Sequence, residues 1–360
     1  MVLPIEPEPF LDDALDELFG AETPGGDEYT DNPHPALYDS AGYDAGIVRL
    51  QPVDDTLAAA QSDAATDTEN VTKVKEAMDE ASRLVEQAKK DPAALRRLAA
   101  SIKNLTLSVE NLTLSVDEHL EVLRHMTDDG TVSLAEWVVW RKIPSLTTSD
   151  TAVLLERFDL AVAGGTINSD FEVAKNFFDE QDLPFNCGVV SQKMLLDAAG
   201  IPNISEGILT VRSILDGSLS ESGMHPFRAG DILARYGIPT EPILHANISD
   251  LEAKLEAGHG VLVVVDADEI SSYDAKTGEY KDDDASASDR GVGDNHILWL
   301  KRIDRTGAEP VAIINDSGDP RGAEREIPLH VFMDAFADSG GYAVVTTEPL
   351  NIDASASASD

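Results

Sequence analysis

The stretch DEQDLPFNCGVVSQKMLLDAAG, residues 179–200, contains Cys187, the only cysteine in the 360-residue sequence. Gly200 and Pro202 are typical of a helix end, so we predict a helix from Cys187 to Ala199. The free N–H groups and the positive dipole at a helix start lower the pKa of a thiol. Cys187 is therefore a candidate nucleophile.

Other residues of this stretch fit thiol chemistry. Gln181 precedes Cys187 on a loop broken by Pro184, and its side-chain amide could donate a hydrogen bond to an oxyanion. Gly188 would let a substrate backbone approach closely, and Asn186 is a further candidate for substrate contact. The alternative is that Cys187 is a small buried hydrophobic residue, as lone cysteines often are.

The C-terminal part of the chain, residues 176–348, has helical segments first and strands afterwards. Further helices are predicted in PFRAGDILARYG (226–237) and after a Ser249/Glu252 capping box. Apolar, β-branched runs predict strands at 261–265, 296–303, 311–315 and 342–347. This order indicates an α+β domain rather than alternating βαβ units. The long acidic segment between the first two strands is interpreted as a lid or a disordered loop.

His296 opens the second predicted strand, and Asp316 directly follows the third. If these strands form a hairpin centred on Thr306, His296 and Asp316 face each other with Cβ atoms about 4.5–5.5 Å apart. An acid there would orient and charge the imidazole. Asn315 would point to the other face, although a bulge could exchange the two. Asp266, after the first strand, could line a substrate cleft or belong to a solvated acidic loop.

The order Gln181, Cys187, His296 and Asp316, with the segment IINDSGDPRG, resembles the papain-like cysteine peptidases. It is most similar to the branch that includes the double-glycine leader peptidases of bacteriocin exporters and their free-standing relatives. The resemblance covers 176–348 only, and the turn Asn-Asp-Ser-Gly departs mildly from the Asn-Asp-Pro-like turn of that branch. It implies helices packed on an antiparallel sheet, with no metal or other cofactor.

We therefore expect a cysteine peptidase that hydrolyses peptide or related amide bonds of a peptide or protein substrate. Cys187 would be the nucleophile, His296 the base and Asp316 its orienting acid, with Gln181 as oxyanion donor. An acyl transferase on the same fold would use the same residues. The sequence is also compatible with a catalytically inert peptide-binding module, or with a delivered effector or toxin.

The region 71–175 is predicted to be helical. Apolar residues from Leu98 to Leu120 are spaced three or four apart, and NLTLSVE and NLTLSVD repeat in tandem, as in a coiled coil, although LTLSV also suits a strand. Residues 118–178 resemble a degenerate EF-hand pair centred on Gly130 and Gly165. Carboxylates are missing at the first and third ligand positions, so we expect no calcium binding.

Residues 1–70 carry 17 Asp or Glu and a single Arg. Low periodicity and high charge predict a mostly disordered acidic segment, and 349–360 is predicted to be a disordered tail. Within the acidic segment, 9–20 has the apolar face of a short helix. That helix could dock on a partner protein or fold back on this chain.

Composition excludes several functional classes. The net charge of −40 repels nucleic-acid phosphates and anionic lipid. One cysteine permits no internal disulfide, and no apolar run is long enough to insert into a membrane. The N-terminus lacks a basic region followed by a continuous apolar stretch, so we expect a cytoplasmic protein or one exported without a cleaved signal peptide.

Overall fold

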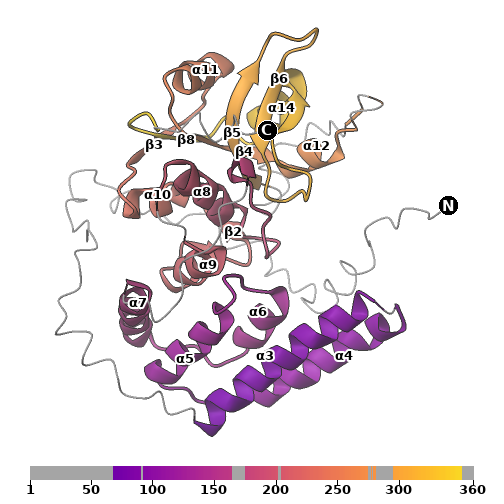
Figure 1. The fold of residues 1–360 in the computed structure, drawn as a ribbon, viewed down its shortest axis with the longest axis vertical. Helices are drawn as coiled ribbons and strands as arrows, with labels where there is room; N and C mark the ends of the chain where they lie inside the picture. The colour runs from indigo at the N-terminus through magenta and orange to yellow at the C-terminus, as the bar shows by residue number, and fades with distance from the viewer. Residues whose placement is uncertain are drawn as a thin grey trace, which may run out of the picture. The chain divides into compact units, whose positions relative to one another are not determined.

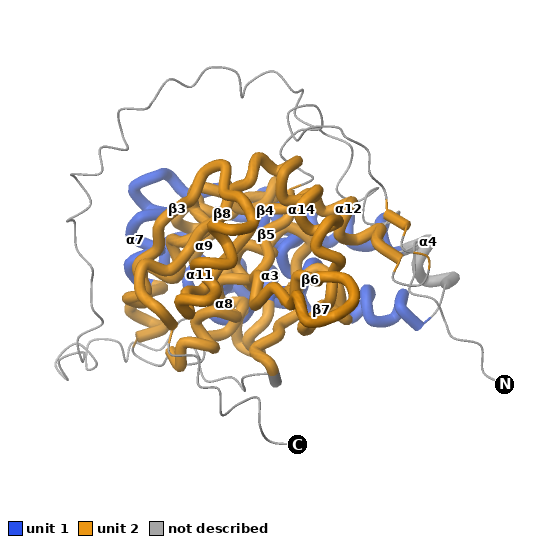
Figure 2. Tube along the Cα trace, turned by 90° about the horizontal axis from the view of Figure 1, so that it is seen from above, with its two compact units in different colours: residues 1–45, 59–126, 132–157 blue, residues 46–58, 127–131, 158–360 orange. Residues whose placement is uncertain are grey.

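The computed structural model describes residues 68–90, 92–163, 175–201, 204–274, 277, 279–280 and 295–350. The chain forms two compact units, coloured separately in Figure 2. Within the described residues, the first unit comprises 68–126 and 132–157, and the second comprises 127–131 and 158–350. The predicted docking helix, nearly all of the acidic segment and most of the C-terminal tail lie outside the described residues.

The first unit is helical, as predicted. Its helices are α3 (Glu69–Ala88), α4 (Pro92–Val109), α5 (Val116–Met126), α6 (Leu134–Trp140) and the first part of α7 (Thr148–Ala163). Thr68 caps α3 by accepting a hydrogen bond from the Val71 N–H, and the stripe Val71, Val74 and Met78 is buried. Helical spacing of apolar residues thus packs α3 against α4 and α6. None of the helices that the structure describes could span a bilayer.

The predicted uninterrupted seam over 98–120 is wrong, because residues 110–115 separate α4 from α5. The two copies of the NLTLSV repeat therefore adopt different structures. In the second copy Ser115 caps a new helix: its N–H donates to Glu118 Oε2 at 2.7 Å, and its Oγ accepts from the Glu118 N–H at 3.3 Å. This reciprocal capping box satisfies backbone groups at the start of α5 and favours a break over a continuous helix.

A helix–loop–helix surrounds Gly130, formed by α5 and α6. The acids that align with calcium ligands make local contacts instead. Asp129 Oδ1 accepts from the N–H of Thr131 at 3.0 Å and from its hydroxyl at 2.8 Å. Glu136 closes a capping box with Ser133 at the start of α6. The second EF-hand-like stretch, around 165, lies outside the described residues.

The second unit is an α+β fold, which confirms the predicted fold class (Figure 1). Its antiparallel sheet has the strand order β3-β8-β4-β5-β6-β7. The strands are β3 (Thr240–Ile243), β4 (Val261–Asp266), β5 (Asn295–Asp304), β6 (Val311–Asn315), β7 (Arg325–Pro328) and β8 (Ala343–Thr346). A small hairpin joins β1 (Leu219–Ser220) and β2 (Gly223–Met224). The helices are α8 (Cys187–Ala198), α9 (Glu206–Leu215), α10 (Asp231–Arg235), α11 (Ile248–Glu256), α12 (Ala267–Ser272) and α14 (Leu329–Asp338), with 3-10 turns η3 (Lys175–Phe177) and η4 (Pro226–Arg228).

Helices cover both faces of the sheet. Val263 of β4 and Leu298 of β5 belong to a core that also contains Phe332 and Phe336 of α14. Successive side chains of a strand point to opposite faces, so Ile297 turns to the other side. There the Ser191 hydroxyl of α8 donates to the Ile297 carbonyl at 2.9 Å. Figure 1 accordingly shows α8 and α14 on opposite sides of β4 and β5. The start of α8 is thereby fixed against the start of β5.

Several local predictions need correction. The helix predicted over 226–237 is divided into η4 and α10. At Gly230, between them, a Cβ would lie 2.1 Å from the Thr240 hydroxyl oxygen, so the backbone packs closely against β3 there. The capping box of α11 is formed by Asn247 and Asp250 rather than by Ser249 and Glu252. The four predicted strands are present as β4, β5, β6 and β8, whereas the short strands β3 and β7 were not predicted.

Candidate active site

Cys187 is the first residue of α8 and is only 8% exposed. The preceding residue, Asn186, makes no side-chain cap, so no side chain competes for the N–H groups of the first turn through that position. Burial raises the pKa of the thiol, whereas the nearby backbone N–H groups of Ile297 and Gly188 lower it. The thiol thus lies where partial positive charge from two backbone segments converges.

His296, the second residue of β5, is the main partner of this thiol. Burial raises the pKa of Cys187, but the charge and the hydrogen bond of His296, with the two backbone N–H groups, outweigh it and lower the pKa. Burial lowers the pKa of His296, whereas the thiolate charge of Cys187 and the contact with Asp316 raise it to about 10. Both shifts favour the same state, in which a thiolate faces an imidazolium.

Asp316 holds the other side of the imidazole. Its Oδ1 lies 2.7 Å from His296 Nε2, which leaves Nδ1 for Cys187. Burial raises the pKa of Asp316, but His296, the Gly318 N–H and the Arg325 guanidinium lower it to a net value below the ordinary one. Arg325 Nη1 is 3.3 Å from Asp316 Oδ2. Sequence reasoning missed Arg325, since nothing around it shows that β7 starts beside this acid.

The route by which Asp316 reaches His296 differs from the predicted one. The β5–β6 register pairs Trp299 with Asn315 and is shifted by a bulge after Leu300, so His296 and Asp316 are not opposite each other. Asp316 lies in the turn just beyond β6. The predicted hairpin centre was therefore wrong, although the predicted pair is in contact.

The turn after β6 depends on Gly322. The Asp316 N–H donates to the Gly322 carbonyl at 3.0 Å, and a Cβ at Gly322 would lie 1.8 Å from the Asp316 carbonyl oxygen. The neighbouring Asn315 faces elsewhere. Its amide donates to the Asn176 carbonyl at 3.2 Å and accepts from the Glu324 N–H at 2.9 Å. Of the two adjacent candidates, Asp316 is thus the one in contact with His296.

Gln181 is tied to the same turn. Its N–H donates to the Ser317 carbonyl at 3.0 Å, and its Oε1 accepts from the Ser317 hydroxyl at 3.0 Å. Its Nε2 donates to the Leu183 carbonyl at 2.9 Å. A side-chain amide has a second N–H on the same nitrogen. The Gln181 amide is therefore held by two partners on a loop that ends at Cys187.

Gly188 has a packing role that the sequence did not indicate. A Cβ there would lie 2.9 Å from Ile297 Cδ1 and 3.0 Å from Met224 Cβ. Such distances are too short for a real Cβ, so the glycine lets α8 approach β5 and β2 closely. The predicted role, close approach of a substrate backbone, stays a prediction beside this packing role.

Asn186 and Asp266 also do not lie where a substrate-contacting side chain would. The Asn186 side chain is fully buried and donates to Glu206 Oε1 at 2.7 Å and to the Thr210 hydroxyl at 3.1 Å. Asp266 is 4% exposed and caps α12 by accepting from the Asp268 N–H at 2.9 Å. We correct both predictions: these side chains stabilise the fold near the site.

Glu206, the first residue of α9, is a buried acid that the sequence did not single out. It is 4% exposed, and its Oε1 also accepts from the Asp182 N–H at 2.8 Å. Burial and the charge of Asp182 raise its pKa to about 8, against the lowering effect of its hydrogen bonds. An acid in the first turn after Ser205 has the usual appearance of a helix start, so its sequence context carried no functional signal.

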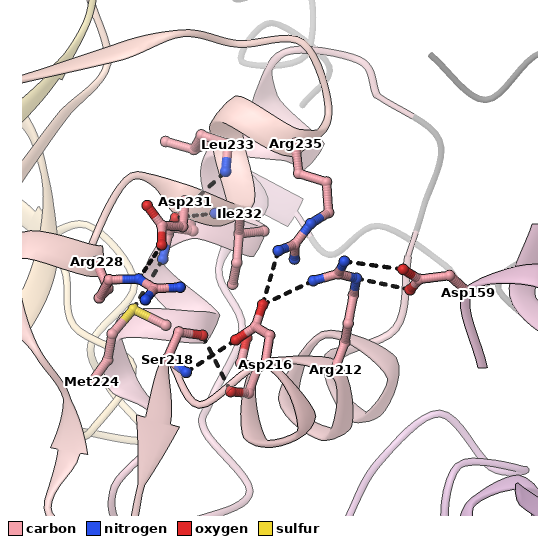
Figure 3. A network of polar contacts seen from close by, with 12 residues as sticks. Asp159, Arg212, Asp216, Ser218, Met224, Arg228, Asp231, Ile232, Leu233 and Arg235 are labelled. Carbon is pink, nitrogen blue, oxygen red and sulfur yellow. Dashed lines mark hydrogen bonds and ion pairs between the residues drawn. The ribbon is translucent and has the colours of Figure 1, made fainter. Parts of the chain in front are cut away.

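A partly buried ion-pair network fixes the other end of α9 (Figure 3). Arg212 makes a two-pronged contact with Asp159, at 2.8 and 3.0 Å, and its Nη1 donates to Asp216 at 2.9 Å. Asp216 also accepts from Arg235 of α10 at 2.8 Å and from the Ser218 N–H at 3.0 Å. Two cations and two anions compensate each other there, so the network holds α9 and α10 together.

Among the described residues, no group of three or more His, Cys, Asp or Glu side chains is arranged to hold a metal ion. The charged groups of the site pair with one another instead. His296 contacts Asp316, and Asp316 contacts Arg325. The arrangement is therefore suited to proton transfer and attack by a thiolate.

Comparisons with known proteins give distant relatives. No family model matches the chain. Uncharacterized proteins of Mycobacterium tuberculosis and Mycobacterium bovis are each 26% identical over 125 residues, 32% of this chain and 50% of the relative. The chain thus spans about half the length of the curated relatives it matches. A crystal structure described as a "putative C39-like peptidase" from Bacillus anthracis is 16% identical, with a TM-score of 0.35, over 50% of this chain and 98% of that one.

Proposed function

We propose that this protein is a cysteine peptidase that hydrolyses peptide or related amide bonds, as papain-like enzymes do. One observation carries the proposal: at the start of α8, Cys187 and His296 shift each other's pKa, and His296 Nε2 lies 2.7 Å from Asp316 Oδ1. The lowered pKa of Cys187 and the raised pKa of His296 favour a thiolate beside an imidazolium. A nucleophile, a base and an orienting acid are the three parts that covalent acyl transfer requires.

The first half of the reaction forms an acyl-enzyme. The Cys187 sulfur attacks the carbonyl carbon of the scissile bond, and the electron pair of the C=O bond moves to oxygen. When the tetrahedral intermediate collapses, the C–N bond breaks and the His296 imidazolium gives its proton to the leaving amine. Asp316 keeps the ring in position and stabilises its charge.

The second half consumes water. His296, now neutral, takes a proton from a water molecule whose oxygen attacks the thioester carbon. The C–S bond then breaks, the carboxylic acid product leaves, and the thiolate–imidazolium pair is restored. The proton that His296 gives to the leaving amine in the first half is replaced by the proton that it takes from water in the second, so the cycle balances.

The negative oxygen of both intermediates needs donors. The backbone N–H of Cys187 and the second N–H of the Gln181 amide are the donors we propose. The support for Gln181 is that its side chain is held through Ser317 and Leu183 on the loop that leads to the nucleophile. Removing one such donor typically costs about 100- to 1,000-fold in rate.

A peptide library treated in parallel with wild type and Cys187→Ala tests this function. We expect cleavage products with the wild type alone, and a mass increase on Cys187 when the reaction is quenched early. Adding a primary amine separates hydrolysis from acyl transfer, because a transferase would yield the amide of that amine. Equal cleavage by the two proteins, or no acyl adduct on wild type with any peptide or activated ester, would overturn the proposal.

A further inference from the structure

We infer that Glu206 is a positioning residue, which holds the loop between Gln181 and Cys187 so that the oxyanion donors keep their place. This inference rests on the proposed function. Glu206 lies 19 residues beyond Cys187 in the sequence, on the next helix, and does not belong to the thiolate–imidazolium pair.

Glu206 fastens this loop at two points. Its Oε1 accepts from the Asp182 N–H at 2.8 Å, next to Gln181. The same oxygen accepts from Asn186 Nδ2 at 2.7 Å, next to Cys187. One carboxyl oxygen therefore joins the residues that adjoin the proposed donor and the proposed nucleophile.

The loop has little freedom to adopt another form while these contacts persist. Asn186 also donates to the Thr210 hydroxyl at 3.1 Å, and its Oδ1 lies 3.4 Å from the Leu183 N–H. Thr210 is one helical turn beyond Glu206, so both acceptors lie on the same face of α9. The loop is thus attached to a helix whose far end is held by the partly buried network of Figure 3.

The opposite side of the loop is attached to the turn after β6. Ser317 binds both the backbone and the side chain of Gln181. Glu206 therefore supplies one of two attachments, and Ser317 supplies the other. Loss of the first would let Asp182 and Gln181 shift relative to Cys187, while His296 and Asp316 keep their own contact.

This role depends on the length of the Glu206 side chain and not on its charge. Its pKa of about 8 keeps it largely protonated at neutral pH, and the carbonyl oxygen of a neutral acid accepts hydrogen bonds as an amide oxygen does. Glu206→Gln keeps that oxygen at the same distance from the backbone. Glu206→Asp keeps the acid but shortens the side chain by one methylene.

Two reactions of Cys187 separate positioning from other effects. Alkylation by iodoacetamide needs the thiolate alone, whereas acylation by p-nitrophenyl acetate also needs oxyanion donors. We expect Glu206→Asp to slow acylation by about 10- to 100-fold, since a displacement near 1 Å costs on this scale. Its alkylation rate should stay within about twofold of wild type, because the thiolate–imidazolium pair is untouched.

The matched variants make the result decisive. Glu206→Gln should acylate close to the wild-type rate. Ser213→Ala, equally buried on the same helix, should have little effect because the Ser213 hydroxyl has no hydrogen-bond partner among the described residues and all contacts of the loop with Glu206 and Thr210 remain. The inference is overturned if Glu206→Asp acylates like wild type, if Glu206→Gln is as slow as Glu206→Asp, or if alkylation falls together with acylation.

The proposed function fails separately. If wild-type Cys187 is alkylated no faster than free cysteine and forms no acyl adduct, the site is not a thiolate nucleophile, and the role inferred for Glu206 falls with it. If the wild type reacts quickly in both assays and the variants do not follow the expected order, the role of Glu206 alone is refuted.

Discussion

Replacement of His296 by alanine removes the main charge that favours the Cys187 thiolate. Burial then acts on the sulfur with only the backbone N–H groups to oppose it, so the pKa of Cys187 should rise from its lowered value. The reciprocal shift of His296, whose pKa is raised to about 10, reflects the same interaction. We expect the alkylation rate of Cys187 to fall most strongly at mildly acidic pH.

The size of this effect follows from the ionised fraction. A thiol with an ordinary pKa near 8.5 is ionised in only about 1 molecule in 100 at about pH 6.5. At that pH His296, with a pKa of about 10, is almost entirely protonated in the wild type and supports the thiolate. A thiolate of lower pKa is also a weaker nucleophile, which offsets part of the gain. The wild type should therefore be alkylated roughly 10- to 100-fold faster than His296→Ala.

The assay is simple because Cys187 is the only cysteine of the chain. Every thiol adduct of iodoacetamide found by mass spectrometry therefore reports on this residue, and the rate can be followed from acidic to alkaline pH. His330→Ala is the matched control, since that histidine has a 60% exposed side chain and pairs with Glu309. Its rate profile should coincide with that of the wild type.

A particular outcome would refute the reasoning. If wild type and His296→Ala show the same rates and the same midpoint near 8.5, the ordinary thiol value, then His296 does not support a thiolate. Unfolding is checked by circular dichroism, because an unfolded chain would expose an ordinary thiol and imitate part of the expected change.

Three other predictions follow from the described contacts. Asp316→Asn removes the carboxylate that helps to raise the pKa of His296 to about 10. In the pH profile of the acylation rate, the decline at alkaline pH should therefore begin at a lower pH than in the wild type. An unchanged profile would contradict the role of this acid. Gly188→Ala should lower the free energy of unfolding by about 1–3 kcal/mol in urea titrations, because the added Cβ would meet Ile297 and Met224. A urea midpoint equal to that of the wild type would show that these two side chains move aside at no cost in stability. Ser133→Ala should cost about 1 kcal/mol by the same measurement, and no loss would mean that water replaces this cap of α6.

The fold class could be predicted because strong patterns dominate locally. The apolar β-branched run at 261–265 specified β4, and Gly200 marked the end of α8. The heptad spacing over 98–120 led to a wrong prediction of one continuous seam. The spacing shows which residues are apolar, but it does not show where a helix ends. Ser115 is a better cap than helix interior residue, and that preference divided the seam into two helices.

The site was predicted in part. His296 and Asp316 are in contact as expected, but a symmetric hairpin could not foresee the bulge after Leu300 or the turn that carries the acid. Roles that depend on distant packing were missed. Glu206 accepts a hydrogen bond from the backbone N–H of Asp182, 24 residues away in the sequence. Every residue except proline has such an N–H, so the sequence does not reveal which one is the donor.

Ser317 and Asp316 are adjacent in the sequence. The Ser317 hydroxyl donates a hydrogen bond to the Gln181 side chain, whereas the Asp316 carboxylate contacts His296. In the proposed mechanism, oxyanion stabilisation by Gln181 and orientation of His296 by Asp316 therefore depend on the same turn. A substitution that reshapes the turn ending at Gly322 would disturb both together. The seven residues from Asp316 to Gly322 thus form one turn that supports both contacts.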